Sequence, residues 1–455
     1  MMFSTKGMSI MKDGEPFVMK GFNLGNWMML ERFMFGFPGV DQLFRRYFRH
    51  YAGEEKYDRF FDCYYTTYFQ EQDAAAMKAM GCNTIRIPFN YRVFEHDLYP
   101  YVYDSSPFTY MDHVVEVCAR YGIYSVIDYH AVQGYENAFH CCDNITGVME
   151  LYHNAECQNR CVKLWEYVAD HFKDNPNVIG YDLINEPGPK DDEVEQLKAL
   201  YRKIIRAVRA IDKDHILFLE GPALSNRFDV MDEVFDDNMG YSPHYYHSGP
   251  KFAAMKDDRQ WRDAIEQDID TRSRMCEKLD IPCWFGEMGI SLGIYDEVRL
   301  RCMDITLELL NQRGYSWNLW TWKDLYRMGL YSTAKDSPWR RQTDRFIRLK
   351  AKYRLDASNV EPWECTEAFF AAFDQDFAEY RQVSDFSVDG NRLDNLKHRL
   401  WNNAANAVSE ILVEDYAQLF AERSMEELEE MISSFSLENC VRKENWYQVF
   451  HKHMR

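Results

Sequence analysis

Short apolar runs and amphipathic segments alternate along the chain from residue 17 to about residue 323. Eight of the runs are rich in β-branched and aromatic residues, which favour strands. These runs span residues 17–23, 83–89, 124–130, 178–184, 216–221, 240–246, 283–288 and 315–320. Segments such as "YMDHVVEVCARYG" and "EVEQLKALYRKIIRAVRAI" lie between them and carry the apolar period of helices. This alternation predicts an α/β fold, a (β/α)8 TIM barrel.

A doubly wound parallel sheet is the alternative to the barrel. Such a sheet normally carries a glycine-rich phosphate-binding turn, G-x-G-x-x-G, after its first strand. The corresponding segment here, "KGFNLGNW" at residues 20–27, lacks that spacing. The barrel is therefore the preferred interpretation.

The pattern changes after residue 355, where strand-like runs disappear and the chain becomes acidic and helical. Within this part, "SMEELEEMISSF" opens with a capping-box pattern from Ser424 to Glu427. We therefore expect a catalytic barrel over residues 1–355 and an acidic helical C-terminal extension, residues 356–455, packed on it. The extension would be either part of the rim of the site or a surface for self-association, which would give a homo-oligomer.

Composition and charge narrow the classes of function. Apolar residues make up 46% of the chain, enough for a large core, and aromatic residues make up 16%. So many aromatic residues suit a sugar-binding cleft, and they suit a dense core equally well. The formal charge of −20 disfavours nucleic acids and anionic membranes, whereas a neutral substrate is easier to accommodate.

The sequence contains no obvious membrane or export signal. No apolar stretch approaches the roughly 20 residues that span a bilayer. The opening segment, "MMFSTKGMSIMKDGEPF", lacks the charged-then-apolar layout of an export signal. These observations predict a cytoplasmic protein with no membrane partner and no nucleic-acid partner.

Twelve cysteines in a chain without an export signal are expected to be free thiols rather than a disulfide framework. One group invites a metal interpretation because it combines histidine and cysteine over a short stretch. It consists of His140, Cys141, Cys142, His153, Cys157 and Cys161. Its spacing matches no familiar zinc pattern, so buried thiols are the preferred interpretation. We predict no metal and no cofactor.

Polar side chains stand at or near the C-terminal ends of most of the predicted strands, where TIM barrels place their chemistry. They are Glu31, Arg86, His130, Asn185, Glu186, His244, Tyr246, Glu287 and Trp320. Each has a structural interpretation by itself: Arg86 could neutralise a buried carboxylate, and His130 could be a core histidine. Together they predict a ring of functional groups at the mouth of the barrel.

Two glutamates stand out in this ring, Glu186 after the fourth strand and Glu287 on the seventh. In a closed barrel the ends of these strands face each other across the mouth. Two carboxylates about 5 Å apart can act together, one attacking an anomeric carbon while the other protonates the leaving oxygen. Their mutual repulsion raises one pKa, which suits an acid that must keep its proton near neutral pH.

Seven segments at the strand ends support a family resemblance. They are "GFNLGNWMMLERF", "MGCNTIRIPFNYRVFE", "VIDYHAVQGYEN", "NVIGYDLINEP", "PHYYH", "WFGEMG" and "WNLWTWKD", in this order. With them the chain resembles the glycoside hydrolase family 5 enzymes, and within these it looks closest to the exo-β-1,3-glucanases. The resemblance covers residues 20 to about 325.

The resemblance implies a role for each polar residue of the inner subsite. Glu186 would be the general acid/base and Glu287 the nucleophile. Asn185 would hold the sugar 2-hydroxyl, and Tyr246 would orient the nucleophile. Arg86, beneath Glu287, would keep that carboxylate ionised, because a nearby cation lowers a carboxylate pKa.

Further residues are implied around the same subsite. His130 and His244 would line it, and Trp320 would form its aromatic floor. Trp322 lies two residues further on, faces the same way in a strand, and remains an alternative to Trp320.

The outer positions are less settled. Glu31 and Asn137 match positions that grip the outer hydroxyls of a terminal glucose, although Asn137 could instead cap a turn and Glu31 could be a solvated loop carboxylate. Asn26 replaces a glycine of the family pattern near the entrance. The loop at residues 139–154 has no clear counterpart, so linkage and chain length stay open.

The sequence thus predicts a retaining, exo-acting β-glycosidase for β-glucosides or short β-glucans, working through a covalent glycosyl-enzyme. A transglycosidase or an endo-β-glucanase on the same glutamate pair is an alternative. A non-catalytic glycan-binding barrel is a third interpretation, disfavoured because both Glu186 and Glu287 are present. The expected partner is a carbohydrate substrate.

Overall fold

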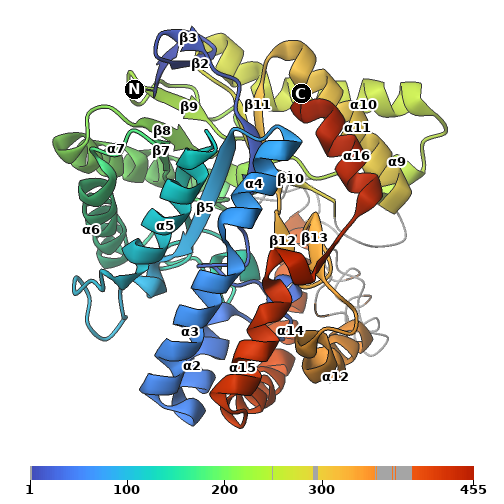
Figure 1. Ribbon diagram of the computed structural model, residues 1–455. Helices are drawn as coiled ribbons and strands as arrows, with labels where there is room; N and C mark the ends of the chain where they lie inside the picture. Colours follow the sequence, from blue (N-terminus) through green and yellow to red (C-terminus); the bar gives the residue numbers. More distant parts are fainter. Residues whose placement is uncertain are drawn as a thin grey trace.

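In the computed structural model of the protein, eight parallel strands form one sheet in the order β10-β11-β4-β5-β6-β7-β8-β9 (Figure 1). The structure describes residues 3–247, 249–290, 296–353 and 392–455, together with positions 355, 371 and 375. The strands are β4 (Lys20–Asn23), β5 (Thr84–Asn90), β6 (Tyr124–Ala131), β7 (Val178–Asp182), β8 (Ile216–Leu219), β9 (Met239–Tyr241), β10 (Trp284–Gly289) and β11 (Ser316–Trp320).

Single bridges between the last and first strands of this order close the sheet into a barrel. Tyr241 pairs in parallel with Cys283, and His244 pairs in parallel with Glu287. The predicted (β/α)8 barrel is therefore confirmed, and each of the eight predicted runs overlaps one barrel strand. The fourth, fifth and sixth strands end earlier than predicted, so Glu220, His244 and Tyr246 stand in the loops that follow.

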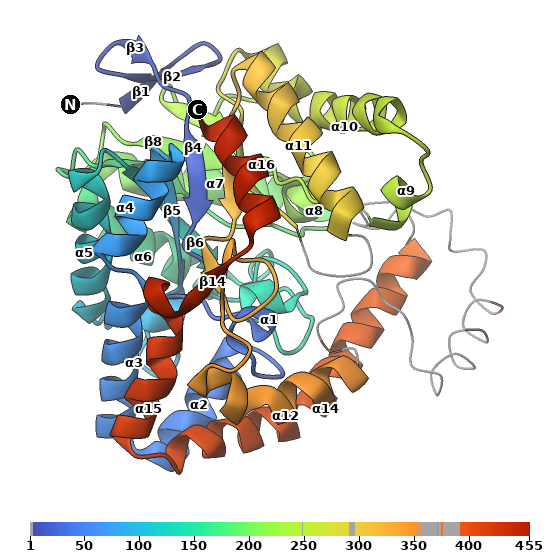
Figure 2. The same cartoon turned by 45° about the vertical axis from the view of Figure 1, so that its right-hand side comes forward.

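Helices connect successive strands, and most of them lie on the outside of the barrel, whereas the two helices between residues 41 and 68 project beyond it (Figures 1 and 2). The connecting helices are α2 (Asp41–Ala52), α3 (Glu54–Tyr68), α4 (Glu71–Met80), α5 (Ser106–Arg120), α6 (Ala155–Phe172), α7 (Val194–Ile211), α10 (Asp258–Leu279) and α11 (Asp296–Arg313), with the short α1 (Arg32–Phe35), α8 (Pro222–Ser225) and α9 (Gly249–Ala253). In α7, for example, Leu197, Tyr201, Ile204 and Val208 are buried on one face, as expected of an amphipathic helix.

A small antiparallel sheet lies at the N-terminal ends of the barrel strands. It consists of β1 (Phe3–Lys6), β2 (Ser9–Lys12) and β3 (Glu15–Pro16). Phe3 and Ile10 pack in one apolar cluster with Met19, Val126 and Trp284 from the barrel. The sequence did not predict this sheet, because its strands are short and their apolar alternation is weak.

The C-terminal part packs against the barrel helices. It begins with α12 (Pro338–Lys352) and continues with α14 (Arg392–Ala421), α15 (Met425–Ile432), β14 (Cys440–Arg442) and α16 (Glu444–Met454). Helix α14 lies along α2, α15 along α3, and α16 along α11 (Figure 2). The predicted capping box from Ser424 to Glu427 is confirmed.

One strand of this part joins a third sheet. β14 pairs antiparallel with β13 (Tyr331–Thr333), which pairs with β12 (Lys323–Asp324). The predicted boundary at residue 356 lies outside the described residues, so the division into barrel and extension stays a prediction.

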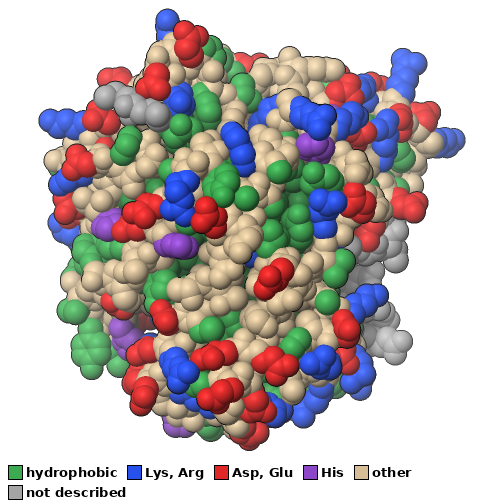
Figure 3. Space-filling model, viewed as in Figure 1, with side chains coloured by type: hydrophobic (Ala, Val, Ile, Leu, Met, Phe, Trp, Pro, Cys, Tyr) green, Lys and Arg blue, Asp and Glu red, His purple; other side chains and the backbone are tan. Residues whose placement is uncertain are grey.

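Within the described ranges, no helix is both long and apolar enough to cross a bilayer. On the face seen in Figure 3, acidic and basic side chains are interspersed. The net negative charge is therefore not gathered into one patch on that face.

Candidate active site

Arg86 on β5 is the centre of a buried charge cluster inside the barrel. Its guanidinium nitrogens lie 2.9 Å from a carboxylate oxygen of Asp182, 3.0 Å from Asp128, 3.1 Å from Glu220 and 3.2 Å from Glu287. One cation cannot balance four carboxylates, and burial and then Glu220 raise the pKa of Asp182 well above its ordinary value. Burial and the neighbouring carboxylates therefore disfavour ionisation of Asp182, and Arg86 opposes this effect.

Glu287 on β10 is held at both carboxylate oxygens. The phenol of Tyr246 donates to Oε1 at 2.5 Å, and Nη1 of Arg86 donates to Oε2 at 3.2 Å. Burial raises the pKa of Glu287 and Glu186 adds to this effect, while His244 and Arg86 oppose it. The two donors stabilise the charged form and fix the direction in which the carboxylate points.

Glu186 lies in the turn after β7, four residues beyond the last strand residue. Its φ of 47° is in the left-handed region, which is uncommon for a residue with a side chain. Its backbone N–H donates to Oε2 of Glu220 at 2.7 Å, and its carbonyl accepts from Nδ2 of Asn137 at 3.0 Å. These two bonds stabilise an otherwise unfavourable backbone conformation.

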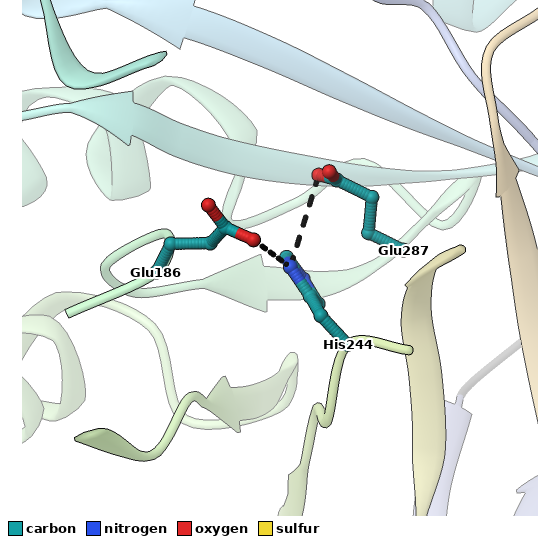
Figure 4. Close-up of side chains that lie close together, drawn as sticks. All are labelled: Glu186, His244 and Glu287. Atoms are coloured by element: carbon teal, nitrogen blue, oxygen red, sulfur yellow. Dashed lines mark hydrogen bonds and ion pairs between the residues drawn. The ribbon is translucent and has the colours of Figure 1, made fainter. Parts of the chain in front are cut away.

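His244 lies between the two glutamates (Figure 4). Its Nδ1 is 2.9 Å from Oε1 of Glu186 and 3.9 Å from Oε2 of Glu287. Burial lowers the pKa of His244, but the carboxylates around it, Glu220 first, more than compensate, so the pKa lies well above its ordinary value. The facing atoms of Glu186, His244 and Glu287 all lie within 4.8 Å of one another.

An aromatic platform forms one wall of the same site. The rings of His130 and Trp320 are stacked, with centroids 5.1 Å apart and planes 9° from parallel, and Nδ1 of His130 lies 2.8 Å from Asp128. Trp322 is fully buried elsewhere, with its indole N–H donating to Asp73. The structure therefore places Trp320, and not Trp322, beside the site, because the strand ends at Trp320 and its alternation does not continue.

Asn185 lies directly between the arginine and the histidine of this wall. Its Oδ1 accepts from Nη2 of Arg86 at 2.9 Å, and its Nδ2 lies 3.5 Å from Nε2 of His130. All the predicted inner residues are thus brought together, from β5, β6, β10, β11 and the loops after β7 and β9.

The two predicted outer residues differ in their surroundings. Asn137 is fully buried, and its amide donates to Glu186 and accepts from the N–H of Phe139, so both its polar atoms serve the loop. Glu31 is 4% exposed, and its Oε2 lies 3.6 Å from Nδ1 of His140. Burial, and then Glu287 and Glu186, raise the pKa of Glu31 well above its ordinary value.

The polar character of Asn26 suggested a side chain at the entrance of the site, but the side chain does not point there. It is fully buried and its Nδ2 donates to the carbonyl of Met34 at 2.9 Å. Its φ of 62° explains why a residue that tolerates the left-handed region occupies this turn.

Comparison with known proteins agrees with this geometry. Residues 50–325 match the family model described as cellulase, glycosyl hydrolase family 5. The chain belongs to glycosyl hydrolase family 5. Among curated relatives of this family 5 chain, a β-xylosidase of Phanerodontia chrysosporium is 29% identical over 96% of the chain and 95% of that protein.

Other relatives of the family 5 chain match in part. A sporulation-specific glucan 1,3-β-glucosidase of Saccharomyces cerevisiae is 26% identical over 60% of the chain and 61% of its own length. Endoglucanase C of Acetivibrio thermocellus is 26% identical over 42% of the chain and 54% of its own length. A hyperthermophilic endo-β-1,4-glucanase solved with substrate has a TM-score of 0.52 at 20% identity, covering 69% of this chain and 92% of that one. At this level of identity, the structural similarity to the endo-β-1,4-glucanase shows a shared fold and nothing about the reaction.

Several residues of this family 5 site were missed in the sequence. Asp128 precedes His130 by two positions, so strand alternation could have placed it in the barrel interior. Asp182 and Glu220 had a weaker signal, a carboxylate in or directly after an otherwise apolar strand. Cys141, whose Sγ lies 3.7 Å from Oε2 of Glu186, had none.

The histidine–cysteine group considered for zinc does not converge in this family 5 barrel. His153 pairs with Glu193, and the thiol of Cys142 donates to backbone carbonyls. Within the described part of the chain, two groups of three candidate ligands lie close together, and neither includes a cysteine. They are Glu186 with His244 and Glu287, and Asp128 with Asp182 and Glu220, where Arg86 already supplies the positive charge.

Proposed function

We propose that this family 5 glycoside hydrolase is a retaining, exo-acting β-glycosidase that releases the terminal sugar of β-glucosides or short β-glucans. The observation that carries the proposal is the pair Glu186 and Glu287, whose facing oxygens lie within 4.8 Å of each other. Retaining glycosidases place their carboxyl groups about 5–5.5 Å apart, whereas inverting enzymes leave room for a water between them.

The two carboxylates are held for different tasks. Glu287 has a hydrogen-bond donor on each oxygen, which suits an ionised nucleophile aimed at the anomeric carbon. Glu186 has one oxygen toward His244 and is the group that would protonate the departing oxygen and later deprotonate water. Asn185, between Arg86 and His130, is placed to meet the sugar 2-hydroxyl.

Exo action is supported by the surroundings of Glu31. This nearly buried carboxylate lies against His140 and close to the catalytic pair, where it could accept hydrogen bonds from the outer hydroxyls of a terminal sugar. Relatives named glucan 1,3-β-glucosidases point in the same direction.

A β-xyloside is the second candidate substrate. The relative that spans 96% of the chain is named a β-xylosidase, whereas the glucosidases match only part of it. Glucose and xylose differ by one hydroxymethyl group, so the residues described above suit either sugar.

A panel of 4-nitrophenyl glycosides tests the proposal: β-glucoside, β-xyloside, β-cellobioside and α-glucoside, with the product anomer followed by NMR. We expect release of 4-nitrophenol from the β-glucoside or the β-xyloside with retained configuration. Activity on the cellobioside alone would favour endo action, and an inverted product would contradict the glutamate pair. Adding an alcohol acceptor separates hydrolysis from transglycosylation.

A further inference from the structure

Glu220 follows β8 and connects three parts of the active site with a single buried carboxylate. Oε2 accepts the backbone N–H of Glu186 at 2.7 Å. Oε1 lies 3.1 Å from Nη2 of Arg86 and 3.2 Å from Nε2 of His244. The same side chain therefore contacts the turn that carries the acid/base and the histidine that contacts the acid/base.

We propose that Glu220 is a positioning residue for the acid/base: it fixes the left-handed turn of Glu186 and holds His244 as an imidazolium that donates from Nδ1 to the Glu186 carboxylate. This inference rests on the proposed function, in which Glu186 is the acid/base.

The contacts of the imidazole ring support a doubly protonated His244. Nδ1 faces Glu186 and Nε2 faces Glu220, so a carboxylate lies within 3.2 Å of each ring nitrogen. A neutral imidazole has one N–H and would leave the other ring nitrogen facing a carboxylate oxygen with a lone pair, whereas an imidazolium presents an N–H to each of them.

The charge of Glu220 is itself stabilised. Burial raises the pKa of Glu220, but His244 and Arg86 outweigh this effect and the pKa lies below its ordinary value. The phenol of Tyr201 donates to the carbonyl of Glu220 at 2.8 Å and fixes its main chain. The Glu220 carboxylate is thus an anion in a fixed position next to the ring of His244.

The charged groups that face the ring of His244 come from four elements of the barrel. They are Glu186 after β7, Glu220 after β8, Glu287 on β10, and Arg86 on β5, which contacts both Glu220 and Glu287. The guanidinium of Arg272 on α10 donates to the backbone carbonyl of His244 and not to its ring. Nδ1 of His244 lies 2.9 Å from the Glu186 carboxylate, so a positive charge on His244 acts directly on that carboxylate.

The variant Glu220→Gln tests the proposal because it keeps an oxygen for the N–H of Glu186 but removes the anion. His244 should then become neutral, and Glu186 loses a cation at 2.9 Å. We expect the basic limb of kcat/KM on an unactivated alkyl β-glycoside to move up by about one pH unit, because the positive charge beside the acid/base is lost. A basic limb in its original place, with a uniformly lower rate, would overturn the proposal.

Two variants serve as controls. Glu195→Gln changes an exposed carboxylate on α7 that pairs with Lys198, and it should leave the midpoint of the basic limb where it is. Glu220→Asp keeps the charge but shortens the side chain, so it should lower kcat while the basic limb stays in place.

A measurement on the wild-type protein needs no turnover. The ¹⁵N shifts of the His244 ring, assigned by their loss in His244→Gln, should report an imidazolium through neutral pH. A neutral ring there would overturn the proposal even if hydrolysis is observed. Absence of hydrolysis of every β-glycoside, with an imidazolium in place, would instead count against the proposed function alone.

Discussion

Glu287 is held from two sides, by the phenol of Tyr246 on one oxygen and by the guanidinium of Arg86 on the other. Glu186, in contrast, contacts a histidine and a thiol, Cys141. The difference between these surroundings matches the proposed roles, in which Glu287 is the nucleophile and Glu186 is the acid/base of the same cycle. Single substitutions can therefore separate the two roles.

Replacing Glu287 by alanine should abolish hydrolysis of 4-nitrophenyl β-glycosides, because no covalent intermediate can form. Azide added to Glu287→Ala should enter the vacated space and give a glycosyl azide of inverted configuration, detectable by NMR. Glu195→Gln, an exposed glutamate on α7, is the control and should behave as wild type. A hydrolysis rate near that of the wild type in Glu287→Ala would contradict the assignment.

Tyr246→Phe should change the pH dependence of activity. Burial raises the pKa of Glu287, and the phenol opposes this by donating to the charged form. A hydrogen bond to a charged group contributes about 1.5–3 kcal/mol, so its loss should move the acidic limb of kcat/KM upward by about 1–2 pH units. The rate falls on the acidic side, where Glu287 becomes protonated; an unmoved acidic limb would contradict a role for Tyr246.

The ring of predicted residues could be found in the sequence because strand ends in a closed barrel meet at one place. Trp320 and Trp322 could not be separated in this way, since the position at which the strand ends decides which of them faces the site. The left-handed turn at Glu186 was not predictable either, because it depends on the carboxylate of Glu220 from the next strand. The local pattern of apolar and polar residues does not report contacts between segments that lie far apart in the chain.

At the scale of the elements, the short helix α1 carries Phe33 to the site, where it packs with Met34, Trp320 and Met328. Helices of the C-terminal part bind the backbone of this helix. The carbonyl of Phe35 accepts from the indole of Trp339 on α12 and from the phenol of Tyr416 on α14, both at 3.1 Å. Glu31 begins the same helix, so α12 and α14 support one wall of the site without contacting it.

Removing the phenol of Tyr416 should therefore affect substrate binding at a distance. In Tyr416→Phe one hydrogen bond to α1 is lost, worth about 0.5–1.5 kcal/mol. We expect KM for the terminal-sugar substrate to rise roughly 2–10-fold with kcat nearly unchanged, since the catalytic pair lies on other elements.

Tyr110→Phe is a matched control, because its phenol bonds Asp62 on the outer surface, away from α1. It should leave KM unchanged. Equal effects of the two substitutions would show that Tyr416 does not act through α1.

At the scale of the whole molecule, helix α16 packs Trp446, Phe450 and Met454 against the barrel, all three buried. The carbonyl of His453 accepts from Lys20 on β4 at 2.9 Å and from Asn311 on α11 at 2.8 Å. The C-terminal part was predicted to be helical and packed on the barrel, but β14 and its pairing with β13 were not, because a three-residue strand has no pattern of its own.

Deleting residues 437–455 should destabilise the barrel itself. Burial of each large apolar side chain contributes about 1.5–3 kcal/mol, so losing three approaches the net stability of a domain, about 5–15 kcal/mol. Urea unfolding should show one transition for the full chain and a much lower midpoint, or none, for the shortened chain. Gln448→Ala, at an exposed position on α16, is the control and should unfold at the same urea concentration as the full chain. If the shortened chain also unfolded at that concentration, the barrel would be stable without residues 437–455.

The contact between Lys20 and His453 also bears on the order of events during synthesis. The first barrel strand leaves the ribosome early, but the partner of its lysine is made after every other barrel strand. Until α16 emerges, the outer side of Phe22, which meets Phe450, stays uncovered. During most of its translation, a nascent chain of this protein therefore exposes the apolar surface that α16 covers in the folded protein. Chaperones bind surfaces of this kind.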